Sequence, residues 1–200
     1  MSAATVADGD GLFYLMGPSG SGKDSLLRAL RERLGADHRI VIAHRYITRA
    51  ADANEASVAL TPEEFHRRRA LGCLALDWHS HGLHYGIGIE IEQWLARGLT
   101  VIVNGSREYL PQAVARYPRL CAVHVRVQPE VLAARLRQRG REAEDAIARR
   151  LARARQAFAV PAGCRLVEID NSGGLESAVA ALAQLVGAAP GASPAAARQA

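Results

Sequence analysis

The sequence predicts an α/β fold in which a parallel sheet is flanked by helices, and two observations lead to this class. Short apolar runs alternate along the chain with segments of helical periodicity, which is typical of parallel strands joined by crossover helices. A glycine-rich loop ending in lysine lies between the first apolar run and the first helical segment. The 200 residues suffice for one such domain with a sizeable core and leave no room for a second of ordinary size.

The expected strands are short apolar runs, whose length suits buried strands. In chain order they are Leu12–Met16, Arg39–His44, Cys73–Trp78, Thr100–Asn104, Cys121–Val127 and Arg165–Ile169. The expected helices repeat apolar residues at helical spacing, and they are Gly22–Leu34, Pro62–Leu71, Glu90–Arg97, Tyr109–Arg116, Pro129–Arg139, Glu142–Ala159 and Leu175–Val186. The second helix has the clearest beginning, because Thr61 is an N-cap residue, Pro62 fits the first helical position and Glu64 completes a capping box.

The two ends of the chain differ from the middle. The stretch 188–200 is rich in Ala, Gly and Pro and has no apolar periodicity, so we expect a flexible tail there. We also expect a flexible N-terminus over residues 1–10. A single domain over residues 11–187 remains.

The net charge of +5 is compatible with three classes of partner: nucleic acid, a membrane surface or a small anion. Between Arg135 and Arg155 there are eight arginines and no lysine, and a local arginine cluster suits a polyphosphate ligand. Aromatic residues make up only 5% of the chain, too few and scattered for a single-strand stacking platform. No apolar run could span a membrane, and the N-terminus lacks a secretory signal. We therefore expect a cytoplasmic protein without a nucleic-acid or membrane partner.

The three cysteines, Cys73, Cys121 and Cys164, are far apart and show no CxxC spacing. This pattern favours neither a disulfide framework nor a zinc site. Each lies in an apolar run, so we expect all three to be buried and reduced.

A phosphate-binding loop follows the first expected strand. Its sequence is Gly17-Pro18-Ser19-Gly20-Ser21-Gly22-Lys23-Asp24-Ser25, the G-x-x-x-x-G-K pattern in the strand–loop–helix context that the motif requires. The glycines let backbone N–H groups surround phosphate oxygens, and the helix N-terminus adds its dipole. Lys23 would then bridge the β- and γ-phosphates of ATP. The alternative is a glycine-rich turn without a ligand.

The residue after Lys23 departs from the motif. Ser or Thr is usual there and binds Mg²⁺ through its hydroxyl, whereas this chain has Asp24 with Ser25 one place later. The expected strand 100–104 also ends in Asn104 and not in an acid, which favours Asp24 or Ser25 as the magnesium contact. The alternative for Asp24 is an ordinary first-turn acid stabilised by the helix dipole.

Several segments together resemble the guanylate kinase family over nearly the whole chain. They are Gly17–Ser25, Ile47-Thr48-Arg49, Thr61–Phe65, Tyr85-Gly86, Asn104-Gly105 and Arg135–Arg155. The resemblance implies a P-loop NTPase fold with an acceptor-binding insertion over about residues 44–95 and an arginine-rich lid over about 135–150. It implies ATP as donor, Mg²⁺ as cofactor, and catalytic roles for Lys23, Arg135, Arg139 and Arg149.

The acceptor pocket differs from that of guanylate kinases, which read guanine with an acid and a Ser/Thr near the Tyr-Gly pair. Here the acid position is Leu76, and Ile87-Gly88 follows Tyr85-Gly86. A buried base edge without partners costs about 1–3 kcal/mol for each unpaired group. GMP is therefore an unfavourable acceptor.

Further blocks resemble the ribose 1,5-bisphosphate phosphokinases of phosphonate breakdown. They are Met16–Leu27, Ala43–Arg49, Trp78-His79, Gly82-Leu83, Tyr85-Gly86 and Val103–Arg107. The resemblance implies that ATP phosphorylates ribose 1,5-bisphosphate to 5-phosphoribosyl 1-diphosphate and ADP. A bisphosphate acceptor needs cations and hydroxyls, and the candidates are Arg45, Arg49, Tyr85 and Arg107, since ligands collect at the carboxyl ends of strands.

Other functions remain open on the sequence alone. A nucleoside monophosphate kinase with an unusual base pocket is one, and a non-catalytic binding module of guanylate-kinase type is another. The histidine-rich segment 78–84 has two interpretations. Its imidazoles are common metal ligands, and a segment that lines the acceptor pocket would explain them too. The partner we expect is a small sugar bisphosphate, and a homodimer is compatible with the sequence.

Overall fold

The larger sheet of the computed structural model is parallel and has five strands within the described residues, which are 8–35, 39–50, 57–138, 140 and 143–187. The strands lie in the order β2-β7-β1-β8-β9. Their bounds are β1 Leu12–Met16, β2 Ile40–Ile42, β7 Thr100–Asn104, β8 Cys121–Arg126 and β9 Arg165–Asp170. Because β1 is central and buried throughout, the loop that follows it starts from a rigid position.

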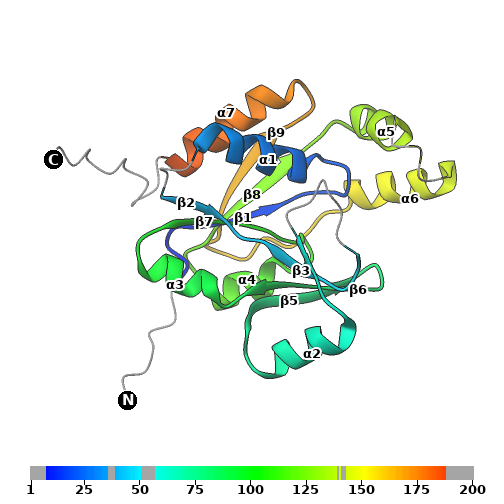
Figure 1. The fold of residues 1–200 in the computed structure, drawn as a ribbon. Helices are drawn as coiled ribbons and strands as arrows, with labels where there is room; N and C mark the ends of the chain where they lie inside the picture. Colours follow the sequence, from blue (N-terminus) through cyan, green and yellow to red (C-terminus); the bar gives the residue numbers. More distant parts are fainter. Residues whose placement is uncertain (1–7, 36–38, 51–56, 139, 141–142, 188–200) are drawn as a thin grey trace, which may run out of the picture.

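Helices cover both faces of this sheet (Figure 1). One face carries α1 (Lys23–Leu34) and α7 (Leu175–Gly187), and the other carries α3 (Glu90–Ala96) and α4 (Leu110–Arg116). The alternation along β1 matches these layers, because Phe13 and Leu15 pack in the α1–α7 core and Tyr14 and Met16 pack in the opposite core.

A second sheet lies beside the first and has the strand order β4-β3-β6-β5. Its elements are β3 Arg45–Ile47, β4 Ser57–Ala59, β5 Leu74–Ser80 and β6 Leu83–Gly88, with α2 Pro62–Ala70 packed against it. The β3–β6 and β6–β5 pairs are antiparallel, and β3–β4 is parallel. This sheet occupies most of the region 44–95 that was expected to bind the acceptor.

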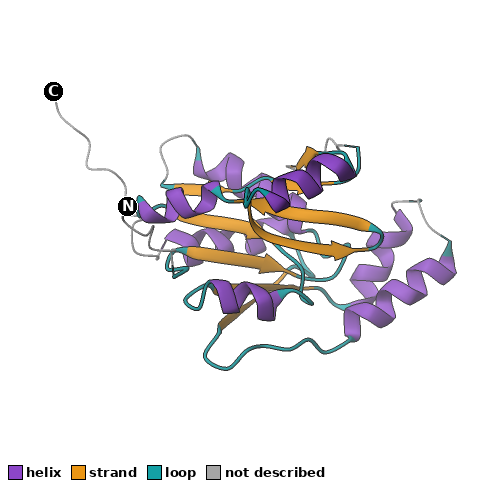
Figure 2. Ribbon diagram, turned by 90° about the horizontal axis from the view of Figure 1, so that it is seen from below, coloured by secondary structure: helices purple, strands orange, loops and turns teal. Residues whose placement is uncertain are grey.

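Two further helices form a pair at one end of the molecule. They are α5 Pro129–Gln138 and α6 Glu144–Arg155, and both views show them projecting away from the main sheet (Figures 1 and 2). Leu132, Leu136 and Ile147 form a small apolar core between them. The pair therefore has its own packing, separate from the two large cores, and it covers most of the expected lid.

The expected α/β class is confirmed, but two expectations about strands were wrong. The strand expected at 39–44 ends at Ile42, and the chain then enters the second sheet as β3. The second sheet itself, with β3, β4 and β6, was missed, and the strand expected near Cys73–Trp78 belongs to it as β5. These strands are short, partly exposed and paired with distant segments, so their apolar pattern is weak.

The cysteines also correct an expectation. Cys121 is buried, whereas Cys73 is exposed and Cys164 is half-buried. Cys73 and Cys164 each precede a strand and are not part of it.

The expected flexible ends fall mostly outside the described residues, which omit 1–7 and 188–200. Residues 8–10 are described, and the Asp8 carboxylate pairs with Arg119 at 3.0 Å. In the described part of the chain, no helix combines the length and apolar character needed to cross a membrane.

Candidate active site

The glycine-rich loop connects β1 to α1 and is closely packed at both ends. Gly20 and Gly22 have φ of 92° and 85°, which favours glycine. A Cβ on Gly22 would lie 2.6 Å from Asn171 Nδ2. That amide donates a hydrogen bond to the Ser21 carbonyl at 2.8 Å, so the loop after β9 fixes the path of the phosphate-binding loop.

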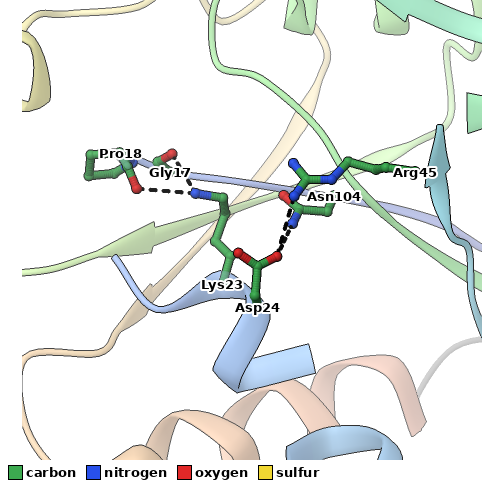
Figure 3. A network of polar contacts seen from close by, with 6 residues as sticks. All are labelled: Gly17, Pro18, Lys23, Asp24, Arg45 and Asn104. Carbon is green, nitrogen blue, oxygen red and sulfur yellow. Dashed lines mark hydrogen bonds and ion pairs between the residues drawn. The ribbon is translucent and has the colours of Figure 1, made fainter. Parts of the chain in front are cut away.

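Lys23 is the only lysine in the sequence, and its ammonium folds back over the loop. Its Nζ donates to the carbonyl oxygens of Gly17 at 2.9 Å and Pro18 at 3.1 Å, as Figure 3 shows. These contacts place the cation where the loop would receive phosphates. The role of Lys23 in bridging the β- and γ-phosphates stays a prediction.

A polar network joins α1 to the carboxyl end of β7 and to the second sheet (Figure 3). Asn104 Nδ2 donates to Asp24 Oδ1 at 2.9 Å, and Arg45 Nη2 reaches the same oxygen at 3.4 Å. Ser25, the other candidate metal contact, lies one residue further along α1 and is half-buried. The network brings a predicted metal contact and a predicted acceptor contact together.

The lid arginines differ in where the structure places them. Arg135 Nη1 is buried and has no hydrogen-bond partner within the described residues; it would lie 3.9 Å from a Cβ on Gly22. Arg149 is exposed on α6, and Arg139 lies outside the described residues. Arg135 is therefore the predicted lid arginine that the structure brings to the loop.

Sequence reasoning missed Arg150, which faces the loop from α6. Its Nη1 donates to Ser19 Oγ at 2.6 Å. Ile147 and Leu151 pack between α5 and α6, and a residue three positions after Ile147 lies on the neighbouring helix surface. Using these two apolar positions to orient the helix would have identified Arg150.

The acceptor candidates on the second sheet surround an aromatic stack. Tyr85 on β6 stacks on Trp78 with ring centroids 5.6 Å apart and an interplanar angle of 7°. The Arg45 guanidinium lies 5.9 Å from the Tyr85 ring centroid, within range of a cation–π interaction. Arg49 follows β3 and is exposed. Arg45 and Tyr85 thus form one unit on the side of the sheet near the phosphate-binding loop.

Arg107, the fourth acceptor candidate, is only 8% exposed and holds the end of α6. Its guanidinium donates to the carbonyl oxygens of Arg153 at 2.9 Å and Ala154 at 3.1 Å. It also lies 5.9 Å from the Phe158 ring centroid. These contacts hold the C-terminus of α6, where the Arg153 carbonyl also accepts from the Gln156 N–H at 3.2 Å.

Tyr14 positions the turn that carries Arg107. Its buried hydroxyl donates to the Ser106 carbonyl and accepts from the Ser106 N–H, both at 2.9 Å. Burial raises the pKa of Tyr14, so the hydroxyl keeps the proton that it donates. This residue was also missed, because it appears in the sequence as one more apolar strand residue.

The histidines of segment 78–84 do not gather around one point. Among the described residues, no group of three His, Cys, Asp or Glu side chains is arranged to hold a metal ion. The His84 ring lies between those of His66 and His79, at centroid distances of 4.8 and 5.0 Å. His81 Nδ1 lies 3.5 Å from Arg153 Nη1 on α6, so the turn between β5 and β6 meets the lid.

Comparison with known proteins agrees with this geometry. A family model described as an AAA domain matches residues 14–157. The chain is 56% identical over 182 residues to ribose 1,5-bisphosphate phosphokinase PhnN of Achromobacter xylosoxidans, covering 91% of this chain and 95% of that protein. It is 59% identical over 176 residues to the protein of the same name from Thiobacillus denitrificans, covering 88% and 92%.

Among solved structures, guanylate kinase from Anaplasma phagocytophilum has a TM-score of 0.63 at 16% identity, covering 88% of this chain and 83% of that one. This likeness confirms the expected fold of a P-loop kinase. The sequence matches are far closer and extend over nearly the full length of both chains. The chain therefore belongs to the family of ribose 1,5-bisphosphate phosphokinases.

Proposed function

We propose that the protein transfers the γ-phosphoryl group of ATP to ribose 1,5-bisphosphate, giving 5-phosphoribosyl 1-diphosphate and ADP. The observation that carries this is the close match to relatives bearing that enzyme name over about nine-tenths of the chain. In the reaction, an oxygen of the 1-phosphate attacks the γ-phosphorus of ATP. The bond from that phosphorus to the β–γ bridging oxygen breaks, and ADP leaves.

The chemistry needs no dedicated general base. The attacking oxygen belongs to a phosphate that is already ionised near neutral pH, so positioning and charge neutralisation carry the rate. Lys23, Arg135 and Arg150 supply positive charge on the ATP side. Arg139, which the described residues omit, and the exposed Arg149 are proposed to join them when the lid closes.

The residues Gly17 to Ser25 are proposed to cradle the ATP phosphates through backbone N–H groups. The oxygen-rich set of Asp24, Ser25 and Asn104 suits Mg²⁺, which favours oxygen ligands. The Oδ1 of Asn104, which has no hydrogen-bond partner among the described residues, supports this fit. When bound, Mg²⁺ would neutralise charge on the β- and γ-phosphates.

The acceptor is proposed to bind on the second sheet. Arg45, Arg49 and Tyr85 would hold one phosphate and orient the sugar, and Arg107 is kept as a fourth candidate. Leu76 and Ile87, at the positions that read guanine in guanylate kinases, are 1% and 0% exposed. They pair with each other across β5 and β6, so neither offers a polar partner to a base.

A coupled ADP-release assay with MgATP tests the proposal. We expect turnover with ribose 1,5-bisphosphate, with the diphosphate sugar appearing in step with ADP, and no turnover with GMP or the other nucleoside monophosphates. Turnover with GMP alone would move the protein to the nucleotide kinases. Absence of turnover with every acceptor would favour a binding module.

A further inference from the structure

The two residue types of the usual magnesium site, an acid and an uncharged polar residue, stand in exchanged positions on the phosphate-binding loop and strand β7. In P-loop NTPases a hydroxyl residue after the lysine and an acid on a neighbouring strand together hold Mg²⁺. Here the residue after Lys23 is the acid, Asp24, and β7, which pairs directly with β1, ends in the amide Asn104. The site of this chain also has one carboxylate, but it lies on helix α1, whereas in the usual pattern it lies on the strand.

The two exchanged residues contact each other. Asn104 Nδ2 donates to Asp24 Oδ1 at 2.9 Å, across 80 residues of chain. The reverse orientation of the amide would set its oxygen against the carboxylate, so the contact fixes which end of Asn104 faces Asp24. The amide is thus oriented by Asp24, and the carboxylate by the amide.

This orientation leaves one atom unexplained. Asn104 is 3% exposed, and its Oδ1 is buried without a hydrogen-bond partner among the described residues. A buried acceptor without a partner is unfavourable, and this one belongs to the side chain that contacts Asp24. A water bound to a metal ion is a strong hydrogen-bond donor and would satisfy this atom.

The Asp24 carboxylate also has an oxygen that can contact a cation. Its contacts with Asn104 and Arg45 both end on Oδ1, and the Asp24 side chain is 45% exposed. The other oxygen of the carboxylate, Oδ2, lies on the side of Lys23, as Figure 3 shows. Its place in the first turn of α1 also stabilises a negative charge there.

We propose that Asp24 is the direct protein ligand of the magnesium ion that accompanies ATP, and that Asn104 is its positioning residue. Asn104 holds the carboxylate through Nδ2 and accepts a hydrogen bond from a metal-bound water at Oδ1. The proposal rests on the proposed function only in taking ATP with a divalent cation as the donor. It would hold for any phosphoryl acceptor.

Binding of Mn²⁺ in the presence of a non-hydrolysable ATP analogue tests the proposal without turnover. Electron paramagnetic resonance gives the affinity of the enzyme–analogue complex for Mn²⁺, and water-proton relaxation reports how many waters remain on the ion. We expect Asp24→Asn to weaken Mn²⁺ affinity about tenfold or more and to raise the number of bound waters. Analogue binding in EDTA should not weaken, since a negative charge near the phosphates is removed.

The exchange itself can be reversed as a test of Asn104. Asn104→Leu, which keeps the side-chain volume, should weaken Mn²⁺ affinity about tenfold. Asp24→Ser should lose affinity as Asp24→Asn does, and Asp24→Ser with Asn104→Asp should recover most of it, because the usual hydroxyl and strand acid are restored. Glu176→Gln is the matched control, since Glu176 is a first-turn acid of α7 and should leave Mn²⁺ affinity unchanged.

Several outcomes would overturn the proposal. If Asp24→Asn binds Mn²⁺ within twofold of the unchanged protein, Asp24 is an ordinary first-turn acid paired with Arg45. If Asn104→Leu has no effect, or the double variant binds no better than Asp24→Ser, Asn104 has no part in the metal site. None of these results depends on which sugar or nucleotide accepts the phosphoryl group, so the proposed function is tested separately.

Discussion

At the scale of single residues, the P-loop lysine is chemically unique in the protein. Every other basic side chain apart from histidine is an arginine, because Lys23 is the only lysine among 25 basic residues. Its Nζ lies on two carbonyl oxygens of its own loop. An incoming phosphate would replace these neutral acceptors with charged ones, which form stronger hydrogen bonds.

Lys23→Ala should therefore abolish most of the transfer while the protein stays folded. Loss of a cation on the transferring group costs about a hundredfold to a thousandfold in kcat, measured by ADP release, with circular dichroism to verify the fold.

The unique lysine allows a second measurement on the unchanged protein. An amine-acylating reagent followed by peptide mass spectrometry should modify Lys23, and MgATP should protect it. Full activity of Lys23→Ala, or modification that ATP does not slow, would contradict the assignment.

At the scale of elements, helix α6 contacts both the phosphate-binding loop and the second sheet. Arg150 contacts Ser19 at one point of the helix, and Arg153 contacts His81 in the β5–β6 turn. Arg107 fixes its C-terminal carbonyls. The C-terminal end of α6 is thus held by a buried arginine that belongs to the turn after β7.

Replacing Arg107 should have a larger effect on the stability of α6 than on the affinity for the acceptor. Arg107→Ala removes the guanidinium donor from two carbonyls of α6, of which that of Arg153 keeps its bond from the Gln156 N–H, and we expect a loss of about 1–3 kcal/mol in unfolding free energy. Hydrogen exchange in α6 should become faster, and the KM for ATP should rise. Arg155→Ala, at an exposed position of the same helix, is the control. A rise in the acceptor KM alone, with normal exchange in α6, would instead support direct contact of Arg107 with the acceptor.

Sequence patterns predicted the elements whose information is local. Strand Leu12–Met16, the glycine loop and the start of α2 at Thr61 were all found, because each depends on neighbouring residues, and Thr61 Oγ1 indeed accepts from the Glu64 N–H at 3.2 Å. The three-residue strands β3 and β4 could not be found in this way. They are held by pairing with distant segments, which leaves no periodic pattern in so short a run.

The site shows the same division between local and distant information. The motif identified Lys23 and Asp24 from their position in the loop. It could not show that Asn104 contacts Asp24, that Arg150 faces Ser19 or that Arg107 binds α6, because each contact joins residues more than forty positions apart. Their relative positions depend on strand order and helix rotation, which the sequence leaves open.

At the scale of the whole molecule, the second sheet carries a cluster of histidines where α2 packs on it. His84 on β6 contacts Phe65 and His66 of α2 and His79 of β5. Burial lowers the pKa of His84 below its usual 6.5, and the neighbouring His66, His79 and Arg69 lower it further, while Asp77 opposes them. Protonation of His84 is therefore unfavourable where α2 packs on the sheet.

The protein should become less stable as the pH falls below about 6.5. A histidine whose folded pKa is lowered takes up its proton more readily when unfolded, so its contribution to stability is complete above the unfolded pKa and declines below it. His124 adds in the same direction, since burial lowers its pKa against the opposing Glu168. Carboxylates with lowered pKa values matter only as the pH falls toward 4.5 and below, so the window from about pH 7.5 to 5.5 isolates the histidines.

Thermal unfolding between about pH 7.5 and 5.5 measures how stability depends on pH, and the variant His84→Gln shows how much of that dependence comes from His84. The variant should have a shallower dependence of Tm on pH than the unchanged protein, because a glutamine side chain does not titrate. His44→Gln, at an exposed position outside the cluster, should keep the original slope. Hydrogen exchange in α2 and the second sheet should become faster on acidification in the unchanged protein and less so in His84→Gln, whereas the effect of His124 on β8 should be the same in both. An equal slope in His84→Gln and the unchanged protein would show that this cluster does not make the stability of the protein depend on pH.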